Sequence, residues 1–162
     1  MTSIDPRHGM STLVNHVQEG HHPQHSHVSP IYQTSTFSFP DVDTGAAIFA
    51  GTTPGHVYTR MGNPNMEQLA EKIAVLEGLD LLRDAPGKAV NEVVMAHVFS
   101  SGMAAVTSAI LARVQSGDTV IAMESLYGAT YTFLKSMAPR YGINVVWINK
   151  PSMKNWEAAL AA

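Results

Sequence analysis

The sequence contains no cysteine. This absence excludes a disulfide framework, a thiolate metal site, a cysteine nucleophile and a CxxC redox pair. No apolar run approaches the roughly 18 residues that a membrane span requires, and the first residues, MTSIDPRHGM, contain no apolar signal core. Together these absences favour a soluble protein of the reducing cytoplasm.

Charge is also scarce. Charged residues make up 14% of the chain, and the formal net charge is −3, which excludes a strongly basic nucleic-acid binder and an acidic tail protein. Apolar residues make up 45% of the 162 residues, enough to fill a core and too many for a disordered chain. We therefore expect a folded protein of single-domain size that binds neither nucleic acid nor a membrane.

Residues 1–60 lack a regular pattern. They hold seven of the eight histidines and several prolines, and no helical periodicity fits them. Residues 29–40 have β-prone residues between two prolines, which favours extended chain. Sixty residues without a helix are long for an internal loop. We expect residues 1–60 to form an extended arm that packs against another protein surface, such as that of a second subunit.

Residues 61–162 show regular periodicity. Helices are expected at 64–77, with Asn63 as N-cap and Gly78 as the stop, at 102–114 after a Ser101 cap, at 127–137 and after Ser152. Strands are expected at 93–99, 119–123 and 143–148, and a loop at 79–92. This order predicts an α/β fold, a parallel or mixed sheet with helices on both faces. Three strands make a thin sheet, so we expect the first part of a larger domain.

The junction at Ser101, Gly102 and Met103 is the first candidate site. A buried strand is expected to run directly into a helix there, and the unpaired N–H groups of a helix start attract anions such as phosphate. Gly102 would allow close approach, and the Ser101 hydroxyl could cap the helix or bind the anion. An ordinary strand–helix turn with a serine cap would have the same sequence. The junction matches neither a Walker loop nor G-x-G-x-x-G, which disfavours a nucleotide-binding domain.

Two further candidates are aromatic or cationic. Arg60 offers a planar fork for phosphate or carboxylate, and Tyr58 lies two residues away, on the same face of an extended chain. A surface ion pair is the alternative for Arg60. Tyr127 follows the second expected strand, at the sheet edge where α/β proteins bind ligands, and could stack on a flat ring. A rim or core tyrosine is the alternative there.

Metal binding is not expected. The cluster His21, His22, His25 and His27 is interrupted by Pro23, no Cys is available to join it and no Glu lies within it, so a solvated His-rich arm is the better interpretation. The run from Asp41 to Gly45 resembles a calcium loop only faintly, because its register fails.

Taken together, the motifs resemble the N-terminal part of the pyridoxal-phosphate (PLP) enzymes of Cys/Met metabolism. That family includes cystathionine γ-synthase, cystathionine γ- and β-lyases, methionine γ-lyase and O-acetylhomoserine sulfhydrylase. The matching stretches, in the order of the family, are SPIYQTSTF (29–37), YTRMGNPN (58–65), LEG (76–78), SSGMAAVTSAI (100–110), SGDTVIA (116–122), LYGATYTF (126–133) and YGINV (141–145).

The resemblance implies a type I aminotransferase-like fold and the following roles. Ser101 and the backbone N–H groups of Gly102 and Met103 would bind the cofactor phosphate. Tyr58 and Arg60 would bind the phosphate held by a neighbouring subunit, within a tetramer built from dimers. Tyr127 would stack on the pyridine ring and take part in catalysis. The substrate would be a small amino acid, undergoing γ- or β-elimination or replacement.

Two departures from the family stand out. The stretch between Gly78 and Val93 is longer than usual. The Schiff-base lysine of the family lies downstream, and none of the chain's lysines, at 72, 88, 135, 150 and 154, has its context. We expect the 162 residues to correspond to the N-terminal portion of a longer enzyme and to be inactive alone. The alternative is a non-catalytic remnant, or a module that binds phosphate and subunits.

Overall fold

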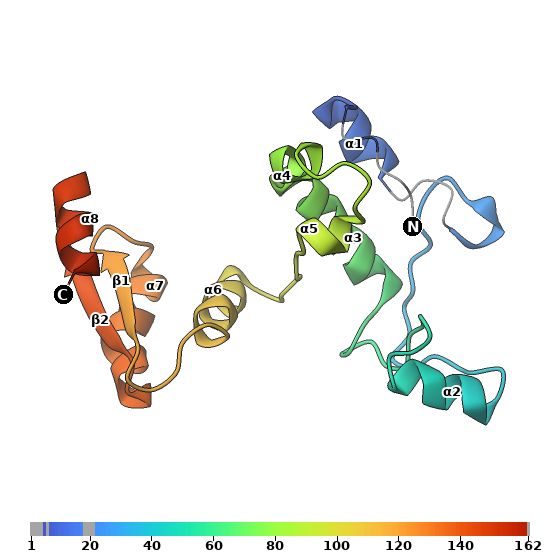
Figure 1. The fold of residues 1–162 in the computed structure, drawn as a ribbon. Helices are drawn as coiled ribbons and strands as arrows, with labels where there is room; N and C mark the ends of the chain where they lie inside the picture. The colour runs from blue at the N-terminus through green and yellow to red at the C-terminus, as the bar shows by residue number, and fades with distance from the viewer. Residues whose placement is uncertain (1–4, 6, 18–21, 162) are drawn as a thin grey trace. The chain divides into compact units, whose positions relative to one another are not determined.

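The computed structural model describes residue 5, residues 7–17 and residues 22–161 (Figure 1). The chain forms two compact units, residues 1–98 and residues 99–162, and each is described by itself. Within the described residues, no helix combines the length and apolarity needed to cross a membrane. The expected division into an arm, 1–60, and an α/β domain, 61–162, stays a prediction.

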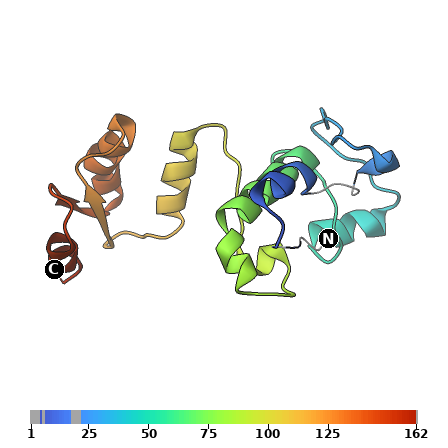
Figure 2. The same cartoon turned by 90° about the horizontal axis from the view of Figure 1, so that it is seen from above.

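The first unit is helical. Its elements are α1 (Met10–His16), η1 (Pro23–His25), α2 (Val42–Phe49), α3 (Pro64–Glu77), α4 (Leu79–Arg83) and α5 (Val90–Val93). The expectation of a helix-free stretch over residues 1–60 is therefore wrong. Helix α1 forms because Leu13 and Val17, one turn apart, are buried beside α3 (Figure 2). Helix α2 forms because the Asp41 carboxylate accepts the Thr44 N–H at 2.7 Å, an N-cap bond.

Helix α3 has the predicted bounds. Asn63 caps it by accepting the Asn65 N–H at 3.0 Å, Pro64 occupies its first position, and Gly78 ends it. The predicted loop at 79–92 is wrong in part, because it contains α4 and the first three residues of α5. Leu79 and Leu82 are buried against Val75, and this burial stabilises a helical turn where the sequence alone showed mostly polar residues.

The expected strand at 93–99 is also wrong. Val93 belongs to α5, and residues 94–98 have no regular secondary structure. A strand requires a hydrogen-bonded neighbour, and among the described residues none pairs with this segment. Val93 and Val94 pack instead against the helical core of the first unit.

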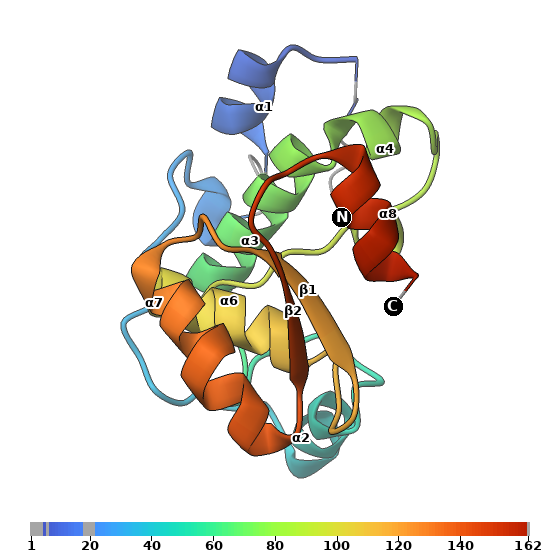
Figure 3. The ribbon, with the colours of Figure 1, turned by 90° about the vertical axis from the view of Figure 1, so that its left-hand side faces the viewer.

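The second unit is α/β. Its elements are α6 (Gly102–Leu111), β1 (Thr119–Met123), α7 (Gly128–Thr132), η2 (Phe133–Met137), η3 (Ala138–Tyr141), β2 (Asn144–Ile148) and α8 (Met153–Leu160). Strands β1 and β2 are parallel, with Thr119 opposite Asn144 and Met123 opposite Ile148; Figure 3 shows them side by side. The parallel α/β class is confirmed, although the sheet described has two strands rather than three.

The local signals in the second unit were accurate. The helical turns of α7, η2 and η3 follow one another and end at Gly142, which has a left-handed φ of 73°. Ser101 and Ser152 cap α6 and α8 as predicted. The core joins β1 to the helices that cross between the strands, and its buried members are Ala122, Leu134, Ala138 and Ile143.

Candidate functional site

In the first unit, residues 29–37 are hydrogen-bonded to the segment that carries Tyr58 and Arg60. Thr36 and Tyr58 form an isolated antiparallel bridge. The Phe37 N–H donates to the Val57 carbonyl at 3.1 Å, and the Thr59 N–H donates to the Ser35 carbonyl at 2.9 Å. Two of the sequence motifs thus form one local structure.

Two asparagines fasten these segments together. Asn65 accepts the Tyr32 N–H through Oδ1 at 2.8 Å and donates through Nδ2 to the Pro30 carbonyl at 2.7 Å. Asn63, which is 4% exposed, donates through Nδ2 to the Tyr32 carbonyl at 3.1 Å. Sequence reasoning found Asn63 only as a helix cap and missed Asn65; the Asn-Pro-Asn spacing was the available signal.

Tyr58 and Arg60 come together, although not through extended backbone as predicted. The Met61 and Gly62 N–H groups both donate to the Tyr58 carbonyl, at 2.8 and 3.1 Å, so the backbone turns here. The Arg60 guanidinium carbon lies 5.3 Å from the centre of the Tyr58 ring, a cation–π arrangement. Both side chains are exposed.

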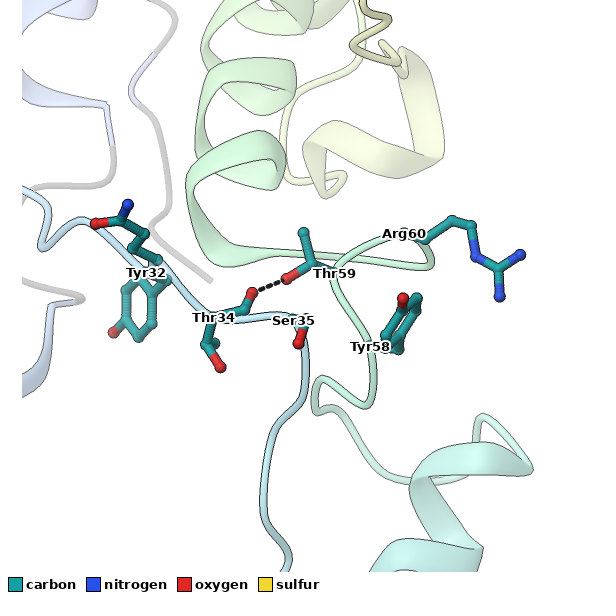
Figure 4. A pocket seen from close by; sticks show the side chains of 7 residues that line it. Tyr32, Thr34, Ser35, Tyr58, Thr59 and Arg60 are labelled. Carbon is teal, nitrogen blue, oxygen red and sulfur yellow. Dashed lines mark hydrogen bonds between the residues drawn. The ribbon is translucent and has the colours of Figure 1, made fainter.

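This pair borders an open hollow of about 610 Å³. Figure 4 shows its lining, which comes from two stretches of the chain, residues 32–35 and 58–60. Within the described residues Arg60 forms no ion pair, so the surface ion pair weighed as the alternative is not what holds it. Its guanidinium donors remain directed toward solvent, where they can bind an anion.

In the second unit, α6 begins with a capped but open turn. The Ser101 Oγ accepts the Ala104 N–H at 3.1 Å. This bond satisfies one of the four N–H groups that a helix start leaves without intrahelical partners, and the N–H groups of Gly102 and Met103 belong to the same set. A Cβ built on Gly102 meets nothing within 4 Å. The space beside the Gly102 Cα is therefore open.

Tyr127 stands at a second helix start close to the first. It precedes α7 and is 73% exposed. The Thr130 hydroxyl, in the first turn of α7, lies 3.5 Å from the Met103 sulfur in the first turn of α6. The structure therefore brings the beginnings of α6 and α7 together. The exposure of Tyr127 excludes the alternative of a core tyrosine.

The chemistry of these groups fits a phosphorylated ring. Two backbone N–H donors at the positive end of a helix suit a phosphate dianion, and an exposed tyrosine ring beside them suits a planar heterocycle. The two groups of candidate residues, Tyr58 with Arg60 and Ser101–Met103 with Tyr127, lie in different units of the chain.

Lys135 is the lysine of the second unit that is nearest to Tyr127 in sequence. Lys135 is on the same helical stretch as Tyr127, but its Nζ donates to the Tyr131 hydroxyl at 3.2 Å and lies over that ring. His21 of the histidine cluster lies outside the described residues. Among residues that are described, no three His, Asp or Glu side chains gather as metal ligands would, and the expectation of no metal stays a prediction.

Comparison with known proteins gives a consistent result. The profile of a family described as "Cys/Met metabolism PLP-dependent enzyme" matches residues 11–162. The L-methionine gamma-lyase of Porphyromonas gingivalis is 40% identical over 132 residues, 82% of this chain and 30% of that protein. The O-succinylhomoserine sulfhydrylase of Pseudomonas aeruginosa is 31% identical over 137 residues, 85% of this chain and 30% of that protein.

A solved structure shares the fold. A crystal structure of a candidate O-acetylhomoserine (thiol)-lyase of Campylobacter jejuni, which contains N'-pyridoxyl-lysine-5'-monophosphate, superposes with a TM-score of 0.77 at 27% identity. The superposition covers 94% of this chain and 34% of that one. The chain thus spans about a third of the length of the relatives that it matches.

Proposed function

Since the chain belongs to the family of PLP-dependent enzymes of Cys/Met metabolism, we propose that it is the cofactor-anchoring N-terminal part of a transsulfuration enzyme. The reaction of that enzyme would be elimination or replacement at the γ or β carbon of a sulfur amino acid or a homoserine ester. The start of α6 carries this proposal: the Gly102 and Met103 N–H groups lack intrahelical partners there, a Cβ on Gly102 would meet nothing within 4 Å, and the start of α7, which follows the exposed Tyr127, contacts Met103.

Each residue has a defined task in this proposal. The N–H groups of Gly102 and Met103 bind the cofactor phosphate, and the Ser101 hydroxyl holds the helix start in shape while it borders the same anion. The Tyr127 ring covers one face of the pyridine, and its hydroxyl is placed to move a proton. When bound, PLP supplies an electron sink for carbanion chemistry.

Tyr58 and Arg60 act on a second copy of the chain. Their ring and guanidinium, 5.3 Å apart, form an exposed anion-binding pair that would contact the phosphate held by α6 of a neighbouring subunit. This places the active site between subunits and requires a homo-oligomer, a tetramer of paired dimers in the full enzyme. The cytoplasm is the location that we propose for it.

The alternative is a non-catalytic module. None of the five lysines lies in the sequence context of the family's cofactor lysine, so the chain could retain phosphate and subunit contacts without turnover. The intact mass of the polypeptide in its native cell separates the two. A mass more than twice 17.5 kDa supports the enzyme, and a mass near 17.5 kDa supports the module.

The phosphate site is tested by NMR on the ¹⁵N-labelled chain. Pyridoxine 5'-phosphate is the probe, because it has the ring and phosphate of the cofactor but no aldehyde to react with lysines. We expect the amide signals of Gly102 and Met103 and the ring signals of Tyr127 to move on titration. Pyridoxine without phosphate should leave the two amides unchanged.

A matched control lies in the same unit. Helix α8 also begins after a serine cap, the Ser152 Oγ accepting the Asn155 N–H at 3.3 Å, but it has neither the glycine nor the tyrosine. The amides of Met153 and Lys154 should not respond. Equal shifts of the amide signals at both helix starts would show only the general attraction of anions to helix dipoles and would refute a specific phosphate site at α6.

Turnover is the second test. The chain is incubated with PLP and L-methionine, and thiol release is compared with that of PLP alone. We expect no excess, because the chain lacks a lysine in the required context. An excess that survives purification would show that one of its own lysines serves the reaction, and would overturn both the expected inactivity and the non-catalytic alternative.

A further inference from the structure

The turn that carries Tyr58 and Arg60 is anchored at the residue between them. The Thr59 hydroxyl donates to the Thr34 carbonyl, and the same oxygen accepts a bond from the Asn63 Nδ2 at 3.2 Å. The Thr59 backbone N–H donates to the Ser35 carbonyl at 2.9 Å. Thr59 therefore makes three hydrogen bonds, two to residues 34 and 35 and one to Asn63 before α3.

This anchoring separates the tasks of three consecutive residues. Figure 4 shows the Thr59 side chain directed at Thr34, while the Arg60 side chain extends away from both. Thr59 is half-buried, whereas Tyr58 and Arg60 are exposed. The Tyr58 carbonyl accepts the Met61 and Gly62 N–H groups within the turn. The Thr59 side chain is the one that links this turn to Thr34 and Asn63, so we expect the geometry of the pair to depend on it.

Asn63 makes the anchor rigid. Its side chain is 4% exposed and is fixed by its own bonds to the Asn65 N–H and the Tyr32 carbonyl. A buried amide that is already held on both sides presents its remaining donor to Thr59 at no further ordering cost. The hydroxyl of Thr59 thus lies between a fixed donor and a fixed acceptor.

We propose that Thr59 is a positioning residue for the anion-binding pair: its hydroxyl holds the turn so that the Arg60 guanidinium stays over the Tyr58 ring and both face one phosphate group. This inference rests on the phosphate role assigned to Tyr58 and Arg60 under the proposed function. It adds a residue that binds no ligand itself and that acts through its two neighbours.

The test uses the whole 162-residue chain and two substitutions of Thr59. Thr59→Val keeps the branched shape and removes the hydroxyl, and Thr59→Ser keeps the hydroxyl. The first readout needs no ligand: the Tyr58 ring shifts the NMR signals of the Arg60 side chain that lies over it. We expect this ring-induced shift to fall by about half or more in Thr59→Val, as the pair loses its fixed geometry, and to survive in Thr59→Ser.

The second readout is the affinity of the pair for inorganic phosphate, followed through the Tyr58 ring signals. We expect Thr59→Val to weaken binding roughly tenfold, the effect of misplacing one charge-assisted hydrogen bond, and Thr59→Ser to restore it to within about twofold of the native chain. Retention of both the shift and the affinity in Thr59→Val would overturn the proposal.

Two further measurements separate positioning from other causes. The bond from the Tyr32 N–H to Asn65 does not involve the hydroxyl, so exchange protection of this amide should persist in Thr59→Val. Its loss would show a merely structural role and would also overturn the proposal. Arg60→Ala tests the underlying function, because unchanged phosphate affinity in this variant would refute the phosphate role of Arg60. In that case the ring-induced shift of the Arg60 signals, measured in the two Thr59 variants, would still decide whether Thr59 positions the pair.

Discussion

Replacing Gly102 by alanine should move stability and phosphate affinity in opposite directions. Gly102 is the first residue of α6, its φ is not left-handed, and a Cβ placed there meets nothing within 4 Å. Alanine therefore fits without strain, and it reduces the conformational freedom of the unfolded chain. Such exchanges stabilise by about 0.4–1 kcal/mol, and we expect about 0.5 kcal/mol at this exposed first turn.

The same substitution should lower the affinity for phosphate. The new methyl group would occupy the open space beside the Gly102 Cα, where we propose that the phosphate approaches the backbone. A hydrogen bond to a charged group contributes about 1.5–3 kcal/mol, so the loss of one weakens binding of pyridoxine 5'-phosphate roughly tenfold to hundredfold. A glycine that binds a ligand is expected to behave in this way: its replacement by alanine raises the free energy of unfolding and lowers the affinity for the ligand.

The assay can be confined to the second unit. Both tryptophans, Trp147 on β2 and Trp156 on α8, lie in that unit, so urea unfolding followed by tryptophan fluorescence reports on it alone. With a urea slope of about 1 kcal/mol per molar, as for a small domain, the expected gain raises the midpoint by about 0.5 M. Affinity is measured in parallel by calorimetry.

Gly128 provides the matched control. It is the first residue of α7, and a Cβ there also meets nothing within 4 Å. Gly128→Ala should raise the midpoint similarly and leave phosphate affinity unchanged. If Gly102→Ala lowers the midpoint, the open geometry at the start of α6 is wrong; if it retains full affinity, the phosphate does not bind there.

Three more predictions concern stability. Ser101→Ala removes the cap on α6 and should lower the free energy of unfolding of the second unit by about 1 kcal/mol, measured as a lower urea midpoint. Ser101→Asp, which can also cap, should retain most of that free energy. Equal losses of stability in the two variants would contradict the capping role. Leu134→Ala deletes a side chain that is 2% exposed and should cost about 2–5 kcal/mol, so that the tryptophan transition shifts far down or disappears; a loss below about 1 kcal/mol would mean that the site is not packed. The bond from the Thr44 N–H lowers the pKa of the Asp41 carboxyl, so the stabilisation of α2 by this cap should be complete above the ordinary carboxyl pKa of about 3.9 and should be lost as the pH falls through the lower native pKa. Asparagine caps without titrating, so in Asp41→Asn the hydrogen exchange of the Thr44 amide should lose this pH dependence. An unchanged pH profile in Asp41→Asn would assign the dependence to another group.

Much of the second unit could be predicted from sequence because its signals are local. A serine before each helix, a short β-branched strand and a left-handed glycine each specify their own few residues. Residue order then gave the parallel pairing of β1 and β2. The proposal of an anion site at the start of α6 rests on the same local rule and stays a prediction.

The first unit was harder because its elements depend on distant partners. Leu13 and Val17 form a helix only because α3 offers a surface to bury them, and Leu79 and Leu82 fold for the same reason. The strand predicted at 93–99 was wrong because Val93 and Val94 pack against a helical core and the segment has no strand partner among the described residues. The role of Asn65 was missed because its partners, near residue 30, are far away in sequence.

The segment 94–98, apolar and without regular structure, has a practical consequence. With Val93 and Phe99 it reads VVMAHVF, with no proline, no glycine and no Asp, Glu, Lys or Arg, the composition of segments that assemble into intermolecular β-structure. Its backbone has no strand partner among the described residues, and Met95 is 68% exposed. Aggregation of the isolated polypeptide would begin here, and a charged residue placed at the exposed Met95, as in Met95→Lys, would oppose it.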